Sequence, residues 1–178
     1  QELGLPAFSP ETAYLATHKG AMKKAMEAFG VATPRFGLVA NLEQLQTFVK
    51  DIQGHLVIKP SDSSGQRATV CLNRDEDWVK AFEAAKQYAS DGHVIVEEFV
   101  SGPEINVTAV VQEGKVDILS LSHRVTASRE YFGIALEHRM PAPLNNQQRQ
   151  AIHDLVYKDI AAIGLNQGIA YPQIIITP

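Results

Sequence analysis

Cysteine, tryptophan and long apolar runs are all scarce in this sequence of 178 residues, which holds one cysteine and one tryptophan. The single cysteine, Cys71, excludes an internal disulfide and a cysteine-based metal site, so a reducing, cytoplasmic setting fits best. The longest apolar runs, such as 174–176, are far shorter than the roughly 20 residues needed to span a bilayer. We therefore expect no membrane insertion, and no signal-peptide pattern opens the chain.

Basic charge is scarce as well, because 16 lysines and arginines face 20 aspartates and glutamates and the net charge is -4. No run of basic residues offers a surface for a polyanion, so we expect no nucleic-acid partner. A small charged ligand is compatible with this balance. The composition, 45% hydrophobic and 20% charged, is that of a globular chain with enough length for one sizeable core or two small lobes.

Helical and β-like patterns alternate in the first part of the chain. Ser9-Pro10 is a helix-start signal, and apolar periodicity predicts helices over 17–29, 42–52 and 76–89. β-rich runs predict strands over 36–40, 55–59, 68–72 and 93–100.

Antiparallel pairing dominates the second part. Two alternating runs, 105–111 and 115–124, flank Glu113-Gly114, which is a good hairpin turn. A further strand is predicted over 135–140, a long helix over 146–163, and a last β-rich run over 168–176. The predicted class is therefore α+β, or mixed α/β, in two lobes joined near Gly102.

The stretch 55–67 carries the first candidate site. Its apolar run ends on Lys59, and a polar loop follows before the next predicted strand. The lysine and the loop donors can all donate hydrogen bonds to the same ligand, and such a cluster of donors suits phosphate oxygens. A polar hairpin connection with a solvated lysine is the alternative. The loop donors are Ser61, Ser63, Ser64 and the amides around Gly65.

Four segments in a fixed order resemble the ATP-grasp superfamily: Lys19 in a helix, Val57 to Arg67, Val96 to Glu104, and Gly168 to Gln173. The resemblance covers nearly the whole chain, and it looks closest to the carbamoyl-phosphate-synthase-like and biotin-carboxylase-like group and to related amino-acid ligases. It implies an ATP-grasp fold, in which two α+β lobes hold the nucleotide between them. The implied division is a helical lead-in from a missing N-terminal domain over 1–34, a small lobe over 35–100, and a larger lobe over 101–178 that is truncated at its C-terminus.

The resemblance implies that ATP is bound through two lysines. Lys59 would bind the α- and β-phosphates, and Lys19 would reach the phosphates from the other wall. The loop would close over the phosphates as a lid, and Arg67 would add charge on the leaving side. The plainer alternatives are a solvated helix lysine, an exposed turn arginine and serines that serve local turns. The implied lid residues are Ser63, Ser64 and Gly65.

The resemblance also gives roles to an unusual group of acidic residues. Glu97 would accept a hydrogen bond from the adenine amino group, the backbone at Glu98 and Val100 would present peptide groups to the ring edge, and Glu104 would take the ribose hydroxyls. Taken alone, Glu97 and Glu98 are also typical of an edge strand defended against pairing, and Glu104 could simply begin a strand.

Two positions depart from the family pattern. Ala68 stands where glycine is usual, which predicts a stiffer lid. Gln173 stands where most members place a magnesium-binding glutamate. Its amide oxygen can bind Mg²⁺ but carries no charge. The alternative is a glutamine in a strand that binds no metal. Arg139 is the candidate for an anion-binding contact, in strands that also hold His123, Arg124 and His138.

Together these roles predict the ATP-binding domain of an ATP-dependent ligase. ATP would phosphorylate a carboxylate or bicarbonate to an acyl phosphate, and an amine or similar nucleophile would displace phosphate. We expect ATP and Mg²⁺ as cofactors, a small-molecule acid and an amine as partners, and a homodimer is compatible with the sequence. The chain begins with Gln1 and stops at Pro178, before the return strand that carries an acid in the family, so we expect this piece alone to be inactive. The alternative is a non-catalytic nucleotide-binding module.

Overall fold

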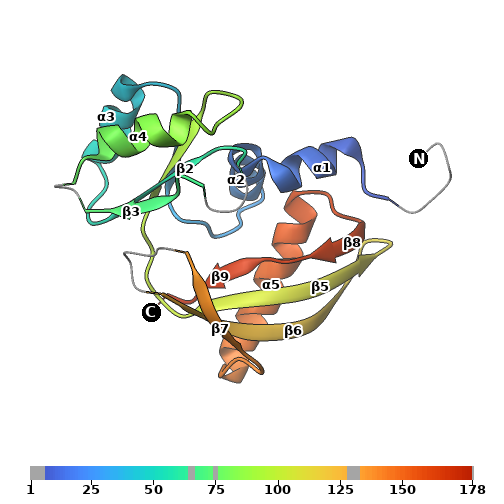
Figure 1. Ribbon diagram of the computed structural model, residues 1–178. Coiled ribbons are helices and arrows are strands. Elements are labelled where there is room, and N and C mark those ends of the chain that lie inside the picture. Colours follow the sequence, from blue (N-terminus) through green and yellow to red (C-terminus); the bar gives the residue numbers. More distant parts are fainter. Residues whose placement is uncertain (1–6, 64–66, 74–75, 128–132, 178) are drawn as a thin grey trace.

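Two antiparallel sheets dominate the computed structural model, which describes residues 7–63, 67–73, 76–127 and 133–177 (Figure 1). The first sheet has the order β1-β4-β2-β3, with strands β1 Phe36–Val39, β4 Val94–Glu98, β2 Leu56–Pro60 and β3 Val70–Leu72. The second has the order β7-β6-β5-β8, with β7 Ala135–Arg139, β6 Lys115–Thr126, β5 Glu104–Gln112 and β8 Gln167–Ala170; β9 Gln173–Ile175 also pairs with β5.

Helices α3 Leu42–Lys50 and α4 Trp78–Lys86 pack on one face of the first sheet (Figure 1). Leu56 and Ile58 of β2 belong to the core between these helices and the sheet. Because side chains alternate along a strand, Val57 and Lys59 point to the opposite face. One face of the first sheet is therefore covered by α3 and α4, and Lys59 lies on the opposite face.

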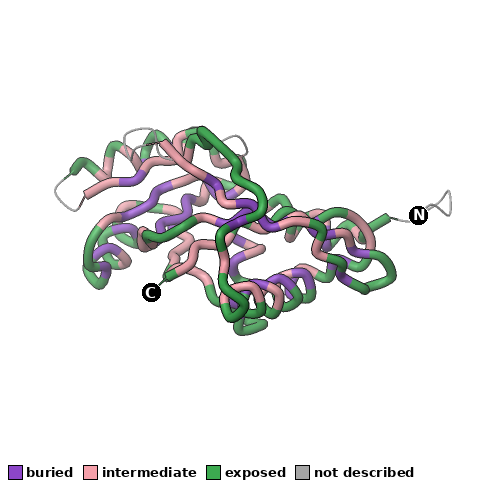
Figure 2. Tube along the Cα trace, turned by 90° about the horizontal axis from the view of Figure 1, so that it is seen from below, coloured by how far each residue is buried: buried purple, intermediate pink, exposed green. Residues whose placement is uncertain are grey.

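Helix α5 Asn146–Ala162 packs on the second sheet and supplies Ile152, Val156 and Ile160 to its core. The spacing of four residues places these side chains on one stripe of the helix. A capping box, in which Asn145 and Gln148 each bind the other's backbone amide, starts this helix. Figure 2 shows the buried stretches along the strands, whereas the connecting turns are exposed.

Two short helices, α1 Pro10–Thr17 and α2 Lys19–Ala28, connect the two halves of the fold. The Thr12 hydroxyl donates to the carbonyl of Gly164 at 2.9 Å, just beyond α5, while α2 reaches a residue of the first sheet through Lys23. Sequence periodicity predicted a continuous segment over 17–29, but His18 separates the helices. Its Nδ1 accepts a hydrogen bond from the Ala21 amide at 3.1 Å and so caps α2.

The chain passes between the sheets through 99–103, where Gly102 has no room for a side chain. A Cβ on Gly102 would lie 2.0 Å from the carbonyl oxygen of Ile176. The Ile176 amide in turn donates to the carbonyl of Pro103 at 3.0 Å. This close approach holds the connection against the end of β9.

The predicted α+β class with mixed helices and antiparallel sheets is confirmed, with two corrections of detail. The β-rich run over 168–176 forms two strands, because Tyr171 and Pro172 interrupt it and proline cannot donate to a ladder. The edge-strand explanation of Glu97 is wrong, because β4 lies between β1 and β2. Within the described residues, no helix has both the length and the apolar character needed to cross a membrane.

Candidate functional site

Lys59 and Glu97 lie side by side on the open face of the first sheet. Glu97 on β4 is directly opposite Val57 on β2, and Lys59 is two residues further along the same face. The Lys59 ammonium lies 2.7 Å from Oε1 of Glu97, and the Lys23 ammonium lies 3.1 Å from the same oxygen. Both ammonium groups therefore share one oxygen of Glu97.

Lys23 is a buried charge on α2 with a complete set of protein partners. Besides Glu97, its ammonium donates to the Thr33 hydroxyl at 2.7 Å and lies 5.2 Å from the centre of the Phe36 ring. Burial lowers the pKa of Lys23, and the charge of Glu97 opposes that shift. Lys23 therefore holds Glu97 from the side of α2. The sequence does not reveal this role, because a lysine in a helix gives no sign that it is buried.

Lys19, the first residue of α2, joins this cluster. Its backbone amide donates to the carbonyl of Ser61 at 2.8 Å, and its ammonium donates to the carbonyl of Ser63. Burial lowers the pKa of Lys19, and the nearby charge of Lys59 lowers it further. Lys23 and Lys59 thus contact one buried carboxylate, and Lys19 lies close enough for the charges of Lys59, Asp62 and Glu97 to affect its pKa. Three lysines against two acids leave positive charge for an anion.

A second polar cluster lies at the start of β5. Oε2 of Glu104 accepts from Nη1 of Arg124 on β6 at 2.5 Å and from Nε2 of Gln173 on β9 at 2.5 Å. Arg124 is buried and also donates to the carbonyl of Gly133. Strand pairing places Glu104 opposite Arg124, with Gln173 opposite Asn106.

Residues 52–174 match the family model of the ATP-grasp domain. The chain belongs to the ATP-grasp family. It is 26% identical over 155 residues to a D-alanine--D-alanine ligase of Pseudomonas entomophila (strain L48), a match that covers 85% of this chain and 48% of the ligase. It is 22% identical over 155 residues to the arginine-specific large chain of carbamoyl phosphate synthase of Eremothecium gossypii, which covers 86% of this chain and 14% of that protein.

The structure of an L-amino acid ligase from Bacillus licheniformis superimposes with a TM-score of 0.79 at 23% identity, over 98% of this chain and 40% of the ligase. This likeness confirms the predicted ATP-grasp fold. The present chain spans about half the length of the D-alanine--D-alanine ligase that it matches.

The structure of this ATP-grasp chain brings Lys19, Lys59 and Glu97 together and gathers Glu104 and Gln173 in a second group. The Glu98 amide donates to the carbonyl of Arg35 at 2.9 Å, and Val100 follows β4 in the connection to β5. The nucleotide contacts assigned to all these residues stay predictions, as do the boundaries at 34 and 100, the homodimer and the cytoplasmic location.

The loop that the sequence assigned to phosphate is only partly described. Ser64 and Gly65 lie outside the described residues, and Arg67 is exposed. Ser61 is fully buried, and its hydroxyl donates to Asp91 at 2.5 Å, so this residue serves the fold rather than a ligand. Ala68 has φ of 50°, the left-handed conformation that glycine adopts most readily.

Arg139 lies apart from both clusters on β7. Its guanidinium is exposed, binds both carboxylate oxygens of Glu137 at 2.9 Å, and has its pKa raised by that hydrogen-bonded partner. An anion that used Arg139 would have to share it with Glu137 or displace that carboxylate. Its role as an anion contact stays a prediction.

The described side chains offer little for a metal ion. No group of three or more His, Cys, Asp or Glu side chains among them is arranged to hold one. Gln173 uses its amide nitrogen on Glu104, which leaves one uncharged carbonyl oxygen. A magnesium ion needs one or two carboxylates beside nucleotide phosphates, so this donor set does not fit a metal held by the described residues.

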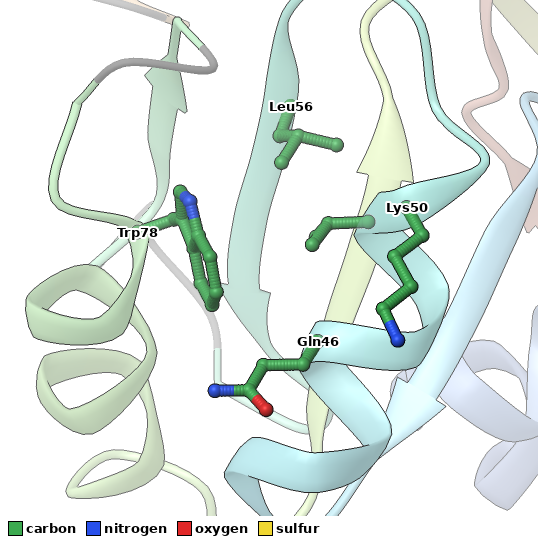
Figure 3. Close-up of a pocket in the computed structure, with 5 residues that line it drawn as sticks. Gln46, Lys50, Leu56 and Trp78 are labelled. Carbon is green, nitrogen blue, oxygen red and sulfur yellow. The ribbon is translucent and has the colours of Figure 1, made fainter.

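A hollow of about 410 Å³ lies between α3, α4 and β2 (Figure 3). Leu56 lines it and points to the helix-covered face, whereas Lys59 points to the opposite face. The hollow is therefore separate from the lysine cluster. Its lining residues are Gln46, Val49, Lys50, Leu56 and Trp78.

Proposed function

We propose that this ATP-grasp chain binds ATP, with the phosphates at Lys19 and Lys59. The observation that supports the proposal is a cluster of three lysines: Lys23 and Lys59 contact the buried carboxylate of Glu97, and Lys19 lies close enough to Lys59 for that charge to lower its pKa. Two lysine ammonium groups close together suit neighbouring phosphates of one polyphosphate. A bound polyphosphate would reduce the repulsion between Lys19 and Lys59.

The nucleoside would extend from the lysines towards Glu104. The carboxylate of Glu97 would accept from the adenine amino group, and the backbone at Glu98 and Val100 would face the ring edge. Glu104 sits at the first residue of β5, where its carboxylate is already fixed by Arg124 and Gln173. A fixed carboxylate can accept from two ribose hydroxyls without reorganising.

The reaction proposed for the whole protein is ATP-dependent ligation. An oxygen of a carboxylate or bicarbonate attacks the γ-phosphorus, the β,γ-bond breaks, and ADP leaves; an amine then attacks the acyl carbon and phosphate departs. Lys19 and Lys59 neutralise phosphate charge and fix its position, which is the main aid that a protein gives to this chemistry. Arg67 and Arg139 are candidates for charge near the reacting group. Because the described residues do not fit a protein-held metal, no step here uses one.

A non-catalytic module that binds ATP and changes shape or partners is the second candidate. Gln173 favours it, because an uncharged amide gives a metal no charged ligand. Phosphate release separates the two functions: a ligase releases phosphate when the right acid and amine are supplied with ATP and Mg²⁺, and a module releases none with any pair.

The test of nucleotide binding is Lys59→Met, measured by calorimetry with ATP and with adenosine. Losing a charged contact of about 1.5–3 kcal/mol should weaken ATP by roughly 10- to 100-fold. Adenosine, which lacks phosphate, should bind within about twofold of the unaltered chain. Lys80→Met, at an exposed lysine of α4, is the matched control. Equal losses for ATP and adenosine, or no ATP binding by the unaltered chain, would overturn the proposal.

A further inference from the structure

Asp91, in the turn between α4 and β4, gathers three hydrogen-bond donors on one carboxylate. Oδ1 accepts from the Ser61 hydroxyl at 2.5 Å and from the His93 amide at 2.9 Å, and Oδ2 accepts from Nε2 of His18 at 2.8 Å. Burial alone would raise the pKa of Asp91, but these bonds outweigh it and bring the pKa down to about 2. The group is therefore a carboxylate at neutral pH.

Two of these donors flank the lysines of the proposed site. His18 directly precedes Lys19, and Ser61 follows Lys59 by two residues. The amide of Lys19 also donates to the carbonyl of Ser61 at 2.8 Å, so the two lysine-bearing segments meet beside Asp91.

The two lysines need such a connection because their like charges repel. The charge of Lys59 is one cause of the lowered pKa of Lys19, and the lysines belong to segments 40 residues apart in the sequence. We infer that Asp91 is a positioning residue, which holds Lys19 and Lys59 at the separation that neighbouring phosphates of a nucleotide require. This inference rests on the proposed ATP site.

The hydrogen bonds of His18 show how the connection works. Its Nδ1 accepts from the Ala21 amide, so the ring proton lies on Nε2 and is donated to Asp91. One imidazole therefore caps α2 and ties the cap to Asp91. Any change that moves this ring moves the first residue of α2, which is Lys19.

Asp91→Asn and Ser61→Ala each break one side of the connection. Oδ1 of the asparagine can still accept from Ser61 and from the His93 amide, but its NH₂ group meets the N–H of His18, and two donors cannot pair. Ser61→Ala removes only the bond on the Lys59 side. The matched control is Asp51→Asn, which removes one aspartate charge at an exposed position paired with Arg35.

The measurements are dissociation constants for ATP and adenosine, with chemical denaturation to check folding. We expect Asp91→Asn to weaken ATP by about 10-fold and Ser61→Ala by about 3- to 10-fold, because displaced lysines meet the phosphates poorly. Adenosine should change by less than about twofold in both variants, and Asp51→Asn should change neither ligand. Long-range ¹⁵N–¹H NMR should show His18 protonated on Nε2 in the unaltered chain and shifted towards Nδ1 in Asp91→Asn.

The outcomes separate the two proposals. If the unaltered chain fails to bind ATP, the proposed function falls and this inference falls with it. If ATP binds and depends on Lys59, but the folded Asp91 and Ser61 variants keep the ratio of ATP to adenosine affinity, Asp91 only stabilises the fold and the inference is overturned. Should Asp91→Asn not fold, Ser61→Ala decides between these outcomes on its own.

Discussion

The Lys59 ammonium lies 2.7 Å from Oε1 of Glu97, the oxygen that Lys23 also approaches. Glu97 is thus the counter-charge of two lysines: Lys59, which is proposed to bind the nucleotide, and Lys23, which is buried in the fold. A nucleotide phosphate would compete with Glu97 for Lys59 but not for Lys23, whose ammonium is also bound to Thr33.

Glu97→Gln should destabilise the protein strongly. It leaves Lys23 buried without a counter-charge, and removing one partner of a buried pair costs about 3–5 kcal/mol. Urea denaturation should show a loss of this size, and the double variant Lys23→Met with Glu97→Gln should recover part of it, because the stranded charge is gone. The exposed pair of Arg35 and Asp51 provides the control, since Asp51→Asn should cost less than about 1 kcal/mol. Equal costs for the two acids would show that Lys23 is well solvated.

Glu104→Ala should weaken adenosine as well as ATP, in contrast to Lys59→Met. The lost charge-assisted bonds to ribose are worth about 1–3 kcal/mol, whichever phosphates are attached. Calorimetry with both ligands measures this, and Glu83→Ala, at an exposed acid of α4, is the control. Because Glu104 also holds Arg124, the comparison is valid only for variant protein shown to be folded. A loss confined to ATP would place Glu104 at the phosphates instead.

Local pattern predicted most elements of this fold, but not the pairings that build the clusters. In a regular hairpin that starts from the pair of Gln112 and Lys115, Glu104 would lie opposite His123. The register shifts between Thr108 and Ala109, so the partner is Arg124. A bulge leaves no reliable mark in the sequence, which is why the Arg124 contact was missed.

The break at His18 and the burial of Lys23 were missed for a different reason. Both depend on partners far along the chain: Asp91 fixes the ring that caps α2, and Glu97 pairs with Lys23. Helical periodicity reports only which residues share a face. By contrast, Lys59 was found because its strand, its polar loop and the neighbouring acids each leave a local pattern.

Asp159 on α5 should make stability depend on pH in an unusual direction. Burial raises its pKa to about 6, and its Oδ1 has no hydrogen-bond partner. An acid whose pKa is higher in the folded state favours folding most at low pH; this contribution is lost as pH rises from the ordinary value of 3.8 to about 6. Asp159→Asn should therefore be more stable than the unaltered chain above pH 6, by up to about 3 kcal/mol for about two pKa units.

The measurement for Asp159 is the difference in unfolding free energy between variant and unaltered chain across the pH range. The difference should shrink towards zero near pH 4, where the aspartate is protonated in both states. Asp154→Asn, at an exposed aspartate of the same helix, should show no such trend. A constant difference at all pH values would mean that the carboxyl of Asp159 is not desolvated.

Ala68→Gly should stabilise the protein, although glycine in place of alanine usually does the opposite. Ala68 has φ of 50°, and a non-glycine residue in this left-handed region carries about 1–2 kcal/mol of strain. Glycine relieves the strain but loses about 0.5–1 kcal/mol through its greater freedom in the unfolded chain. The expected net gain is therefore about 0.5–1 kcal/mol, measured by urea denaturation.

Two comparisons decide whether this gain comes from the backbone. Glu113 also has a positive φ, of 52°, in a hairpin far along the chain, so Glu113→Gly should stabilise by a similar amount. Ala151 is exposed and lies in the interior of α5, and Ala151→Gly should cost about 1 kcal/mol. If Ala68→Gly costs as much stability as Ala151→Gly, the packing of the half-buried Ala68 methyl group outweighs the backbone strain.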